Sequence, residues 1–485
     1  MSIRTKLSTF NSQLSTYKFH LLLFFLSFLI LTKFNIDPDL GWHLAIGERF
    51  LKGGEIVRGD PFSWTMPGYE FGNYFFLYQI VVTFLFVNVG HILTAIVFGA
   101  IASFFVLVLV PKELNFWKMA AVVLGVLVTT SATGIRPSTI SFIFFTTLLV
   151  LLEKKMISKI SHVLFYSGFF AVWANFHQGF MVGLLIMVVF LTADFFWRKS
   201  RKEQVSPGMR AMCILAGFAG SLVTPFHASI WRSAIFDLVG SNTWRAVAEW
   251  QSLVFYFPAN LIYGLSGLIF IYIFFKKFKS FEPAWALISA FLFTLPFLAT
   301  TFAIFWAAIF IFFVSRNLDF KLDLESDIWV KAPILIPSLA FISVIFLSFV
   351  VAIIESRQLT DRLRIDNYPV EAVNYLKEEH VSGRLFNDYG WGGYIIWQAP
   401  EIKVFIDGRM TGWRKADGSY ILADYVAIAR GGCGIADKYQ IETVLITKDL
   451  SVPCFANWQK VYEDQVAKVL VKPYADDSLK VDRLR

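Results

Sequence analysis

The sequence predicts a mostly α-helical polytopic membrane protein that carries a small α/β domain near its C-terminus. Of its 485 residues, 56% are hydrophobic and only 16% are charged, and the mean hydropathy is +0.59. Soluble globular proteins are about a quarter charged. Apolar runs of roughly 16 to 20 residues recur up to residue 354, and each can cross or nearly cross a bilayer. We therefore expect about 11 to 12 hydrophobic helices.

The first apolar run is predicted to be an uncleaved signal-anchor, because no small-residue cleavage site follows it. Later runs are separated by short polar or basic loops, as is typical of consecutive membrane spans. The candidate spans are residues 19–34, 74–88, 91–110, 117–133, 138–152, 162–176, 179–196, 210–226, 259–275, 283–299, 302–315 and 332–354.

Basic clusters between the spans predict the orientation, because cytoplasmic loops are enriched in lysine and arginine. The clusters are Arg4/Lys6, Lys154/Lys155/Lys159, Arg198/Lys199/Arg201/Lys202 and Lys276/Lys277/Lys279. With these clusters inside, we expect a multi-pass protein of the cell inner (plasma) membrane with a cytoplasmic N-terminus. Loops 35–73 and 227–258 and the C-terminal domain then lie outside. Four candidate spans lie between loop 35–73 and Lys154, where this orientation needs an odd number. We expect one of them, 74–88, to be re-entrant or interfacial; the alternative is that the lysines at 154–159 break the rule.

Two domains follow from this pattern: a transmembrane domain over 1–354, whose acidic first outer loop is 35–73, and a soluble extracytoplasmic domain over 355–485. In the latter a helix is predicted at 370–379, with strands at 384–387, 403–409 and 443–447 and a hairpin at 458–471. Ligands prefer the carboxyl ends of strands in such sheets, which makes Asn387, Asp388, Asp407 and Arg409 candidates, the last two for substrate binding. The alternative is a structural ion pair.

Other signals exclude several classes of protein. The net charge of +8 comes from short clusters between spans, so it does not indicate nucleic-acid binding. There is no phosphate-binding glycine loop, nucleophile elbow or zinc motif. Of the three cysteines, Cys213 lies in a span, while Cys433 and Cys454 can pair only in an oxidising compartment and are predicted to be free thiols.

The first outer loop carries the strongest polar cluster. Asp39 follows a proline and precedes a helical pattern, which predicts an N-cap, and His43 lies one helical turn later. Together with Asp37, these side chains can bind a divalent cation through carboxylate oxygens or supply a general base to a hydroxyl nucleophile. The alternative is helix capping in a solvated loop. Phe62 and Trp64, further along this loop, are predicted to be interfacial anchors.

Further polar residues near the outer ends of spans are candidates for substrate binding. Arg136 stands between two apolar runs, where a lipid phosphate or a carboxylate would satisfy its guanidinium; the alternative is an arginine that snorkels to the interface. Asn175 and His177 end a span. The alternative to a role in substrate binding is a structural turn in which their hydrogen bonds are satisfied. Glu249 and Trp250 belong to a loop that can cover the site, or to an interfacial helix.

Several motifs together resemble a family of bacterial membrane proteins and, more broadly, the GT-C superfamily of membrane glycosyltransferases. The resemblance spans nearly the whole chain. The motifs that carry it are residues 37–44 (DPDLGWHL), 60–63 (DPFS), 136–137 (RP), 173–177 (WANFH), 249–250 (EW) and 404–409 (VFIDGR). One departure is that residues 299–303 lack the arginine that often marks a late span in this family.

GT-C membership implies transfer of a sugar from a polyprenyl-phosphate donor to a glycan, lipid or protein acceptor on the outer face of the membrane. The acidic residues of the first outer loop act there as catalytic base or metal ligands, which implies these roles for Asp37 and Asp39, with His43 assisting. Some members use Mg²⁺ or Mn²⁺ and others do not. The alternative function is a non-catalytic transporter, flippase or scaffold for lipid-linked envelope glycans. The lack of an internal repeat and the position of the acids outside the spans favour the enzyme.

Overall fold

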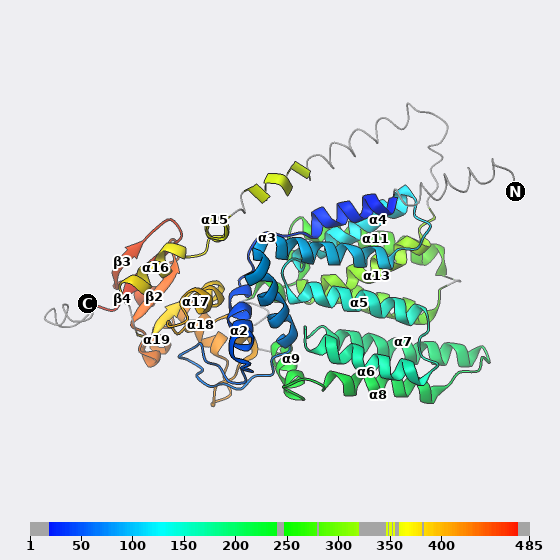
Figure 1. Cartoon of the computed structure of the whole chain (residues 1–485), viewed down its shortest axis with the longest axis horizontal. Coiled ribbons are helices and arrows are strands. Elements are labelled where there is room, and N and C mark those ends of the chain that lie inside the picture. The colour runs from blue at the N-terminus through cyan, green and yellow to red at the C-terminus, as the bar shows by residue number, and fades with distance from the viewer. Residues whose placement is uncertain are drawn as a thin grey trace, which may run out of the picture. The chain divides into compact units, whose positions relative to one another are not determined.

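The computed structural model describes residues 19–239, 247–278, 281–319, 346–347, 349–351, 353–354, 358–380 and 383–473 (Figure 1). Its contacts divide the chain into two compact units. Unit 1 comprises residues 1–34, 92–223 and 249–354, and unit 2 comprises 35–91, 224–248 and 355–485. Most of the predicted span 332–354 lies outside the described residues.

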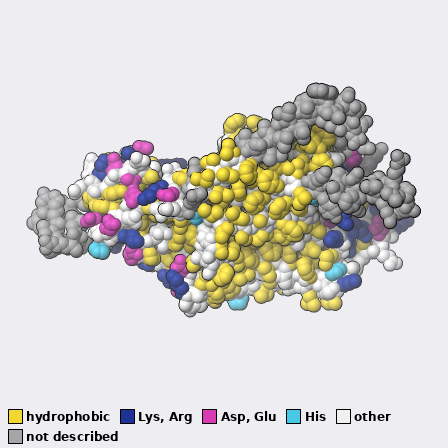
Figure 2. All heavy atoms as spheres, turned by 45° about the horizontal axis from the view of Figure 1, so that its top comes forward, with side chains coloured by type: hydrophobic (Ala, Val, Ile, Leu, Met, Phe, Trp, Pro, Cys, Tyr) yellow, Lys and Arg dark blue, Asp and Glu magenta, His cyan; other side chains and the backbone are white. Residues whose placement is uncertain are grey.

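Unit 1 is built from apolar helices. By length and composition, α3 (Phe76–Leu109, shared with unit 2), α7 (Phe180–Ser200), α11 (Ala259–Lys276) and the run Thr300–Asn317 can cross a membrane. The other helices are shorter: Phe19–Leu31, α4 (Phe116–Val128), α5 (Pro137–Glu153), α6 (Ile160–Ala174), α8 (Pro207–Ser221) and α12 (Pro283–Thr294). Hydrophobic side chains cover much of the helical surface in Figure 2. The protein is therefore an integral membrane protein, as predicted.

Helix α13 (Ala303–Asn317) lies at the centre of unit 1, where it packs on α4, α5, α11 and α12. Every residue from Ala303 to Ser315 is buried. Helix α6 packs on α8 (Figure 1). Helix α7 packs on both α8 and α12. Proline at the first helical position begins α5, α8 and α12, where the missing N–H has no intrahelical role.

The predicted spans 74–88 and 91–110 form the single helix α3, which is broken at Gly90. The backbone of Gly90 has φ 78° and ψ 171°, which glycine adopts without steric cost. The first part of α3 belongs to unit 2, and the remainder belongs to unit 1.

The remaining helices of unit 2 are mostly short, and one sheet accompanies them. The helices are α2 (Leu40–Gly53), α9 (Ser229–Val239), α15 (Leu359–Ile365), α16 (Val370–Glu378), α17 (Gly392–Gln398), α18 (Ile421–Ala429) and α19 (Cys433–Tyr439). Strands β1 (Leu385–Asn387), β2 (Thr443–Thr447), β3 (Gln459–Glu463) and β4 (Ala467–Val471) form the sheet in the order β1-β2-β4-β3. β1 and β2 are parallel, and the other pairs are antiparallel. The small α/β domain, its helix at 370–379 and its closing hairpin are thus confirmed.

The predicted strand at 403–409 is wrong. Val404 makes only an isolated bridge to Ser63 of the first loop. The buried amide of Asn387 takes the place of a neighbouring strand, because its Oδ1 accepts from Phe405 N at 2.8 Å and its Nδ2 donates to Ile406 O at 2.9 Å. The backbone N–H of Phe405 and the carbonyl of Ile406 are therefore satisfied without a ladder.

The first loop, residues 35–73, contributes to the hydrophobic core of the C-terminal residues. Met66 is part of that core, and the indole N–H of Trp64 donates to Leu385 O at 2.9 Å. Phe62 is buried as well. Phe62 and Trp64 are thus packing residues of unit 2 rather than interfacial anchors. By its contacts, loop 35–73 belongs with residues 355–485, whereas the sequence pattern grouped it with 1–354.

Cys433 and Cys454 form a disulfide, so the prediction of two free thiols is wrong. The bond joins the start of α19 to a short 3₁₀ turn, Pro453–Phe455, and the two Cα atoms lie 5.0 Å apart. Spacing in the sequence could not reveal this approach, because it depends on how α19 and this turn pack. Cys213 is a buried free cysteine in α8.

Candidate functional site

The acidic pair of the first loop lies at the start of α2. Asp39 occupies the N-cap position, but its side chain does not cap the helix. Instead Asp37 Oδ1 accepts from Asp39 N at 2.9 Å, and Asp39 Oδ1 accepts from the indole N–H of Trp42 at 3.0 Å. Asp37 is buried, and Asp39 is half-buried. The more accessible carboxylate of the pair is therefore that of Asp39.

His43 lies one helical turn after Asp39, as its spacing predicted, and its backbone N–H donates to Asp39 O at 3.3 Å. Its ring is buried and lies tilted against Trp42 with centroids 3.6 Å apart, and edge-on contacts come from Phe75 and Tyr78. Gln79 Nε2 lies 3.4 Å from the ring Nδ1. These contacts orient the imidazole within an aromatic cluster.

Glycines allow the C-terminal residues to approach α2 closely. A methyl group at Gly408 would overlap Asp39 Oδ1, and one at Gly41 would overlap the carbonyl oxygen of Gly393. Helix α2 therefore packs backbone to backbone on α17. The motifs at 37–44 and 404–409, which the sequence separates by hundreds of residues, are neighbours in unit 2.

Asp407 and Arg409 form a buried ion cluster with Asp60 of the first loop. Arg409 Nε and Nη2 donate to the two carboxylate oxygens of Asp407 at 2.7 and 2.6 Å, and Nη1 lies 2.9 Å from Asp60 Oδ1. Phe62 and Trp413 face the guanidinium at 5.0 and 5.2 Å. Burial alone would lower the pKa of Arg409, but the two carboxylates raise it above its usual value. The contacts join the loop to the C-terminal residues.

A second buried cluster was not predicted from the sequence. Asp237 of α9 accepts from Tyr74 Oη at 2.5 Å and from Thr411 Oγ1 at 2.9 Å, which joins all three chain segments of unit 2. Burial raises the pKa of Asp237 to about 6 despite these hydrogen bonds. Burial, then Asp237, and then Asp39 raise the pKa of Tyr74, which indicates that Asp39 is near this phenol. No sequence motif marks Asp237, which lies in an ordinary amphipathic helix.

In unit 1, two of the predicted substrate-binding residues contact each other. Arg136 Nη1 donates to Glu249 Oε1 at 2.8 Å, and both side chains are partly exposed. The backbone of Glu249 is held by Thr300, whose hydroxyl donates to Glu249 O at 2.9 Å. Trp250 is buried, with its ring centroid 6.4 Å from that of Phe302. Arg136 is therefore satisfied by a carboxylate, one of the two partners that its position suggested.

Asn175 and His177 lie in the turn between α6 and α7 of unit 1. His177 Nδ1 lies 2.7 Å from Ser141 Oγ and accepts from Gly179 N at 3.2 Å, and burial lowers the pKa of this histidine to about 3. Asn175 Nδ2 donates to Ala171 O and Val223 O at 2.8 and 2.9 Å. The structure thus places both residues in a hydrogen-bonded turn that joins α6, α7 and the end of α8.

The residues that the structure describes give no direct support to a divalent cation in the first loop. Among the residues that the structure describes, no group of three or more His, Cys, Asp or Glu side chains could hold a metal ion. Asp37 and Asp39 are joined by a side-chain-to-backbone hydrogen bond.

The sequence matches no protein-family model and no curated protein. Solved structures are similar to it, however. The crystal structure of ArnT from Cupriavidus metallidurans bound to undecaprenyl phosphate superposes with a TM-score of 0.51 at 10% identity, over 95% of this chain and 98% of that chain. The archaeal oligosaccharyltransferase AglB from Archaeoglobus fulgidus, in complex with an inhibitory peptide and a dolichol-phosphate, gives 0.48 at 11% identity, over 88% and 69% of the two chains. The fold is GT-C-like, as the sequence resemblance implied.

Proposed function

We propose that this protein is a membrane glycosyltransferase that moves a sugar from a polyprenyl-phosphate donor to an acceptor hydroxyl at the outer face of the membrane. The observation that carries the proposal is an acidic pair at the start of α2, directly after the first apolar helix, in a chain with a GT-C-like fold. The similar ArnT structure holds undecaprenyl phosphate, a polyprenyl phosphate, and this supports the same class of donor lipid here.

Asp39 is the general base in this proposal. Its carboxylate is half-buried and is held by the indole of Trp42, so it is oriented but still reachable. It takes the proton of the acceptor hydroxyl while that oxygen forms a bond to the anomeric carbon. The bond between the anomeric carbon and the phosphate oxygen breaks, and the polyprenyl phosphate leaves with the electron pair. Asp37 positions Asp39 through the backbone N–H.

Arg136 is our candidate for contact with the donor phosphate. A guanidinium is suited to a phosphate because several of its N–H groups can donate at once. In the structure Arg136 Nη1 donates to Glu249, and the arginine is partly exposed at the start of α5. Asp407 and Arg409 are instead assigned a positioning role, because they are buried and paired with each other.

The disulfide supports our orientation of the chain. Disulfides persist in oxidising compartments and are rare in the cytosol. The Cys433–Cys454 bond therefore favours an extracytoplasmic location for unit 2, which contains the acidic pair. This agrees with the orientation that the positive-inside rule predicts.

The decisive experiment uses purified protein in nanodiscs with a panel of radiolabelled polyprenyl-phosphate sugars, with and without Mg²⁺ or Mn²⁺. We expect turnover or donor hydrolysis that Asp39→Asn and the double variant Asp37→Ala/Asp39→Ala abolish. Asp417→Asn, an exposed aspartate of the same unit, is the matched control and should keep activity. Wild-type turnover that survives in the double variant would refute the base assignment. Donor binding without turnover would instead support a transporter or scaffold.

A further inference from the structure

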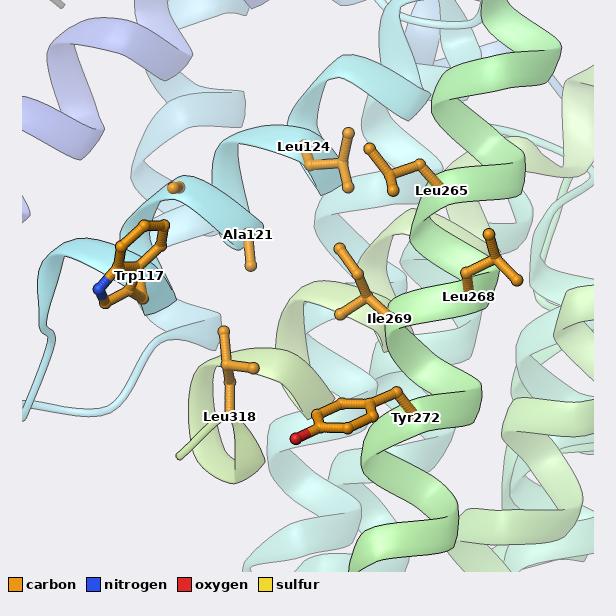
Figure 3. Close-up of a pocket in the computed structure, with 9 residues that line it drawn as sticks. Trp117, Ala121, Leu124, Leu265, Leu268, Ile269, Tyr272 and Leu318 are labelled. Atoms are coloured by element: carbon orange, nitrogen blue, oxygen red, sulfur yellow. The ribbon is translucent and has the colours of Figure 1, made fainter. Parts of the chain in front are cut away.

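An apolar groove runs between α4 and α11 of unit 1. It has a volume of about 560 Å³, which falls in the range of ligand-binding cavities. Its walls are almost wholly apolar. The lining residues labelled in Figure 3 are Trp117, Ala121, Leu124, Leu265, Leu268, Ile269, Tyr272 and Leu318.

The groove opens to the surroundings of the helices rather than into the core. Leu265 and Leu268 are 50% and 66% exposed, and Tyr272 is 54% exposed. These side chains belong to α11, which is long and apolar enough to cross a membrane. In a bilayer the medium that meets such a surface is hydrocarbon, so a lipid chain matches the walls of the groove.

Positive charge gathers at one end of this groove. Lys276 Nζ lies 3.5 Å from the hydroxyl of Tyr272 and 5.6 Å from the centre of its ring. Lys277 pairs with Asp319 at 2.6 Å, and Asp319 directly follows the lining residue Leu318. Lys118 follows the lining residue Trp117.

All three lysines act electrostatically on the carboxylate of Asp319. The hydrogen bond from Lys277 is the largest influence that holds the pKa of Asp319 below its usual range, and the charges of Lys277, Lys118 and Lys276 act in the same direction. Among the residues that the structure describes, these three positive charges accompany the one negative charge of Asp319, which is an excess of two positive charges. An anionic group at this end of the groove would therefore be attracted.

We propose that the α4–α11 groove binds an anionic phospholipid of the surrounding bilayer, whose acyl chain lies along the apolar walls and whose phosphate is held by Lys118 and Lys276. Basic pockets between transmembrane helices on the cytoplasmic side recognise anionic headgroups in this way. Lys276 belongs to a basic cluster that we expect on the cytoplasmic face, whereas the acidic pair is expected on the other face. This lipid is thus separate from the proposed sugar donor.

Native mass spectrometry of the full chain, released from micelles that contain equal amounts of phosphatidylglycerol and phosphatidylcholine with the same acyl chains, tests the proposal. We expect wild-type protein to retain phosphatidylglycerol in preference. Lys118→Gln/Lys276→Gln should lower its retention about tenfold or more, because each lysine near an anionic surface contributes noticeably to attraction. Lys154→Gln/Lys199→Gln removes two exposed basic residues elsewhere in unit 1 and should leave retention unchanged.

A second variant distinguishes lipid binding in the groove from general attraction of anionic lipid to the lysines. Ala120→Phe adds a ring at an exposed lining residue and leaves every lysine in place, so it should also lower retention of phosphatidylglycerol. Equal retention of both lipids by the wild type, or retention that neither groove variant changes, would overturn the proposal. So would an equal loss in the Lys154/Lys199 control. If a segment of the chain itself fills the groove, Ala120→Phe should lower the melting temperature without altering bound lipid, which also overturns it.

Discussion

The carboxylate of Asp39 lies directly against the Cα atom of Gly408, so the candidate base of the first loop is in contact with the motif at 404–409. No side chain fits between them. The position of this carboxylate therefore depends on residues that are hundreds of positions later in the sequence.

Gly408→Ala should displace Asp39 and abolish transferase activity, because a methyl group at residue 408 overlaps Oδ1 of the carboxylate. We expect a loss of activity of at least a hundredfold, as misplacement of a reacting group by about 1 Å has this effect. Steady-state kinetics measures it. Gly434→Ala in α19, where an added methyl meets open space, is the matched control and should behave like wild type. Full activity of Gly408→Ala would contradict the contact.

Variants of the Arg136–Glu249 pair distinguish a structural role of Arg136 from a phosphate-binding role. Arg136→Ala should raise KM for the donor roughly 10- to 100-fold, the usual effect of losing a hydrogen bond to a charged group. The exchanged variant Arg136→Glu/Glu249→Arg keeps an ion pair and should keep the melting temperature, but it should not recover donor affinity. Recovery of wild-type KM in the exchanged variant would show that only the ion pair matters.

The buried carboxyl of Asp237 should make the stability of unit 2 depend on pH. Its folded pKa of about 6 lies above the ordinary value of 3.8, so the folded state holds this proton more tightly than the unfolded state. The contribution is fully present below about pH 4 and is lost as pH rises to about 6, by at most about 3 kcal/mol. Asp237→Asn should remove this decline, as melting temperatures across that interval would measure. A variant with the same decline as wild type would exclude Asp237 as its source.

The disulfide predicts a specific count of reactive thiols. Denatured protein should take up one alkylating group per chain without reductant, at Cys213, and three after reduction. Cys433→Ser/Cys454→Ser should destabilise unit 2 by about 3 kcal/mol, because the bond closes a loop across a separation of 21 residues. Thermal unfolding checks this, and Cys213→Ala serves as the control that removes the single free thiol. Three alkylated sites before reduction would mean that the bond does not form.

The sequence predicted features that follow from local pattern. Long apolar runs predicted the helices of unit 1, and the helical stretch predicted at 370–379 corresponds to α16. The strand at 403–409 was predicted wrongly because Asn387 supplies from its side chain the hydrogen bonds that a neighbouring strand would give. Residue type alone cannot reveal such a substitute.

In the candidate site too, residues marked by local sequence were predicted, and residues that depend on tertiary contacts were not. The acidic residues at 37 and 39 were recognisable because a polar loop directly follows an apolar span. Asp237 was not, since its burial arises from Tyr74 and Thr411, which come from two other segments of the chain. The disulfide was missed for a similar reason, because tertiary packing brings the two cysteines together.

Unit 2 is assembled from an early, a middle and a late segment of the chain, and this has a consequence for biosynthesis. The ribosome makes Asp39 near the beginning, but Gly408 and Arg409, which contact the first loop, emerge only after most membrane helices have been made. The first loop therefore cannot form these contacts until the late residues have been synthesised. A chain that stops near residue 354 would insert its helices and still lack the partners that shape this loop.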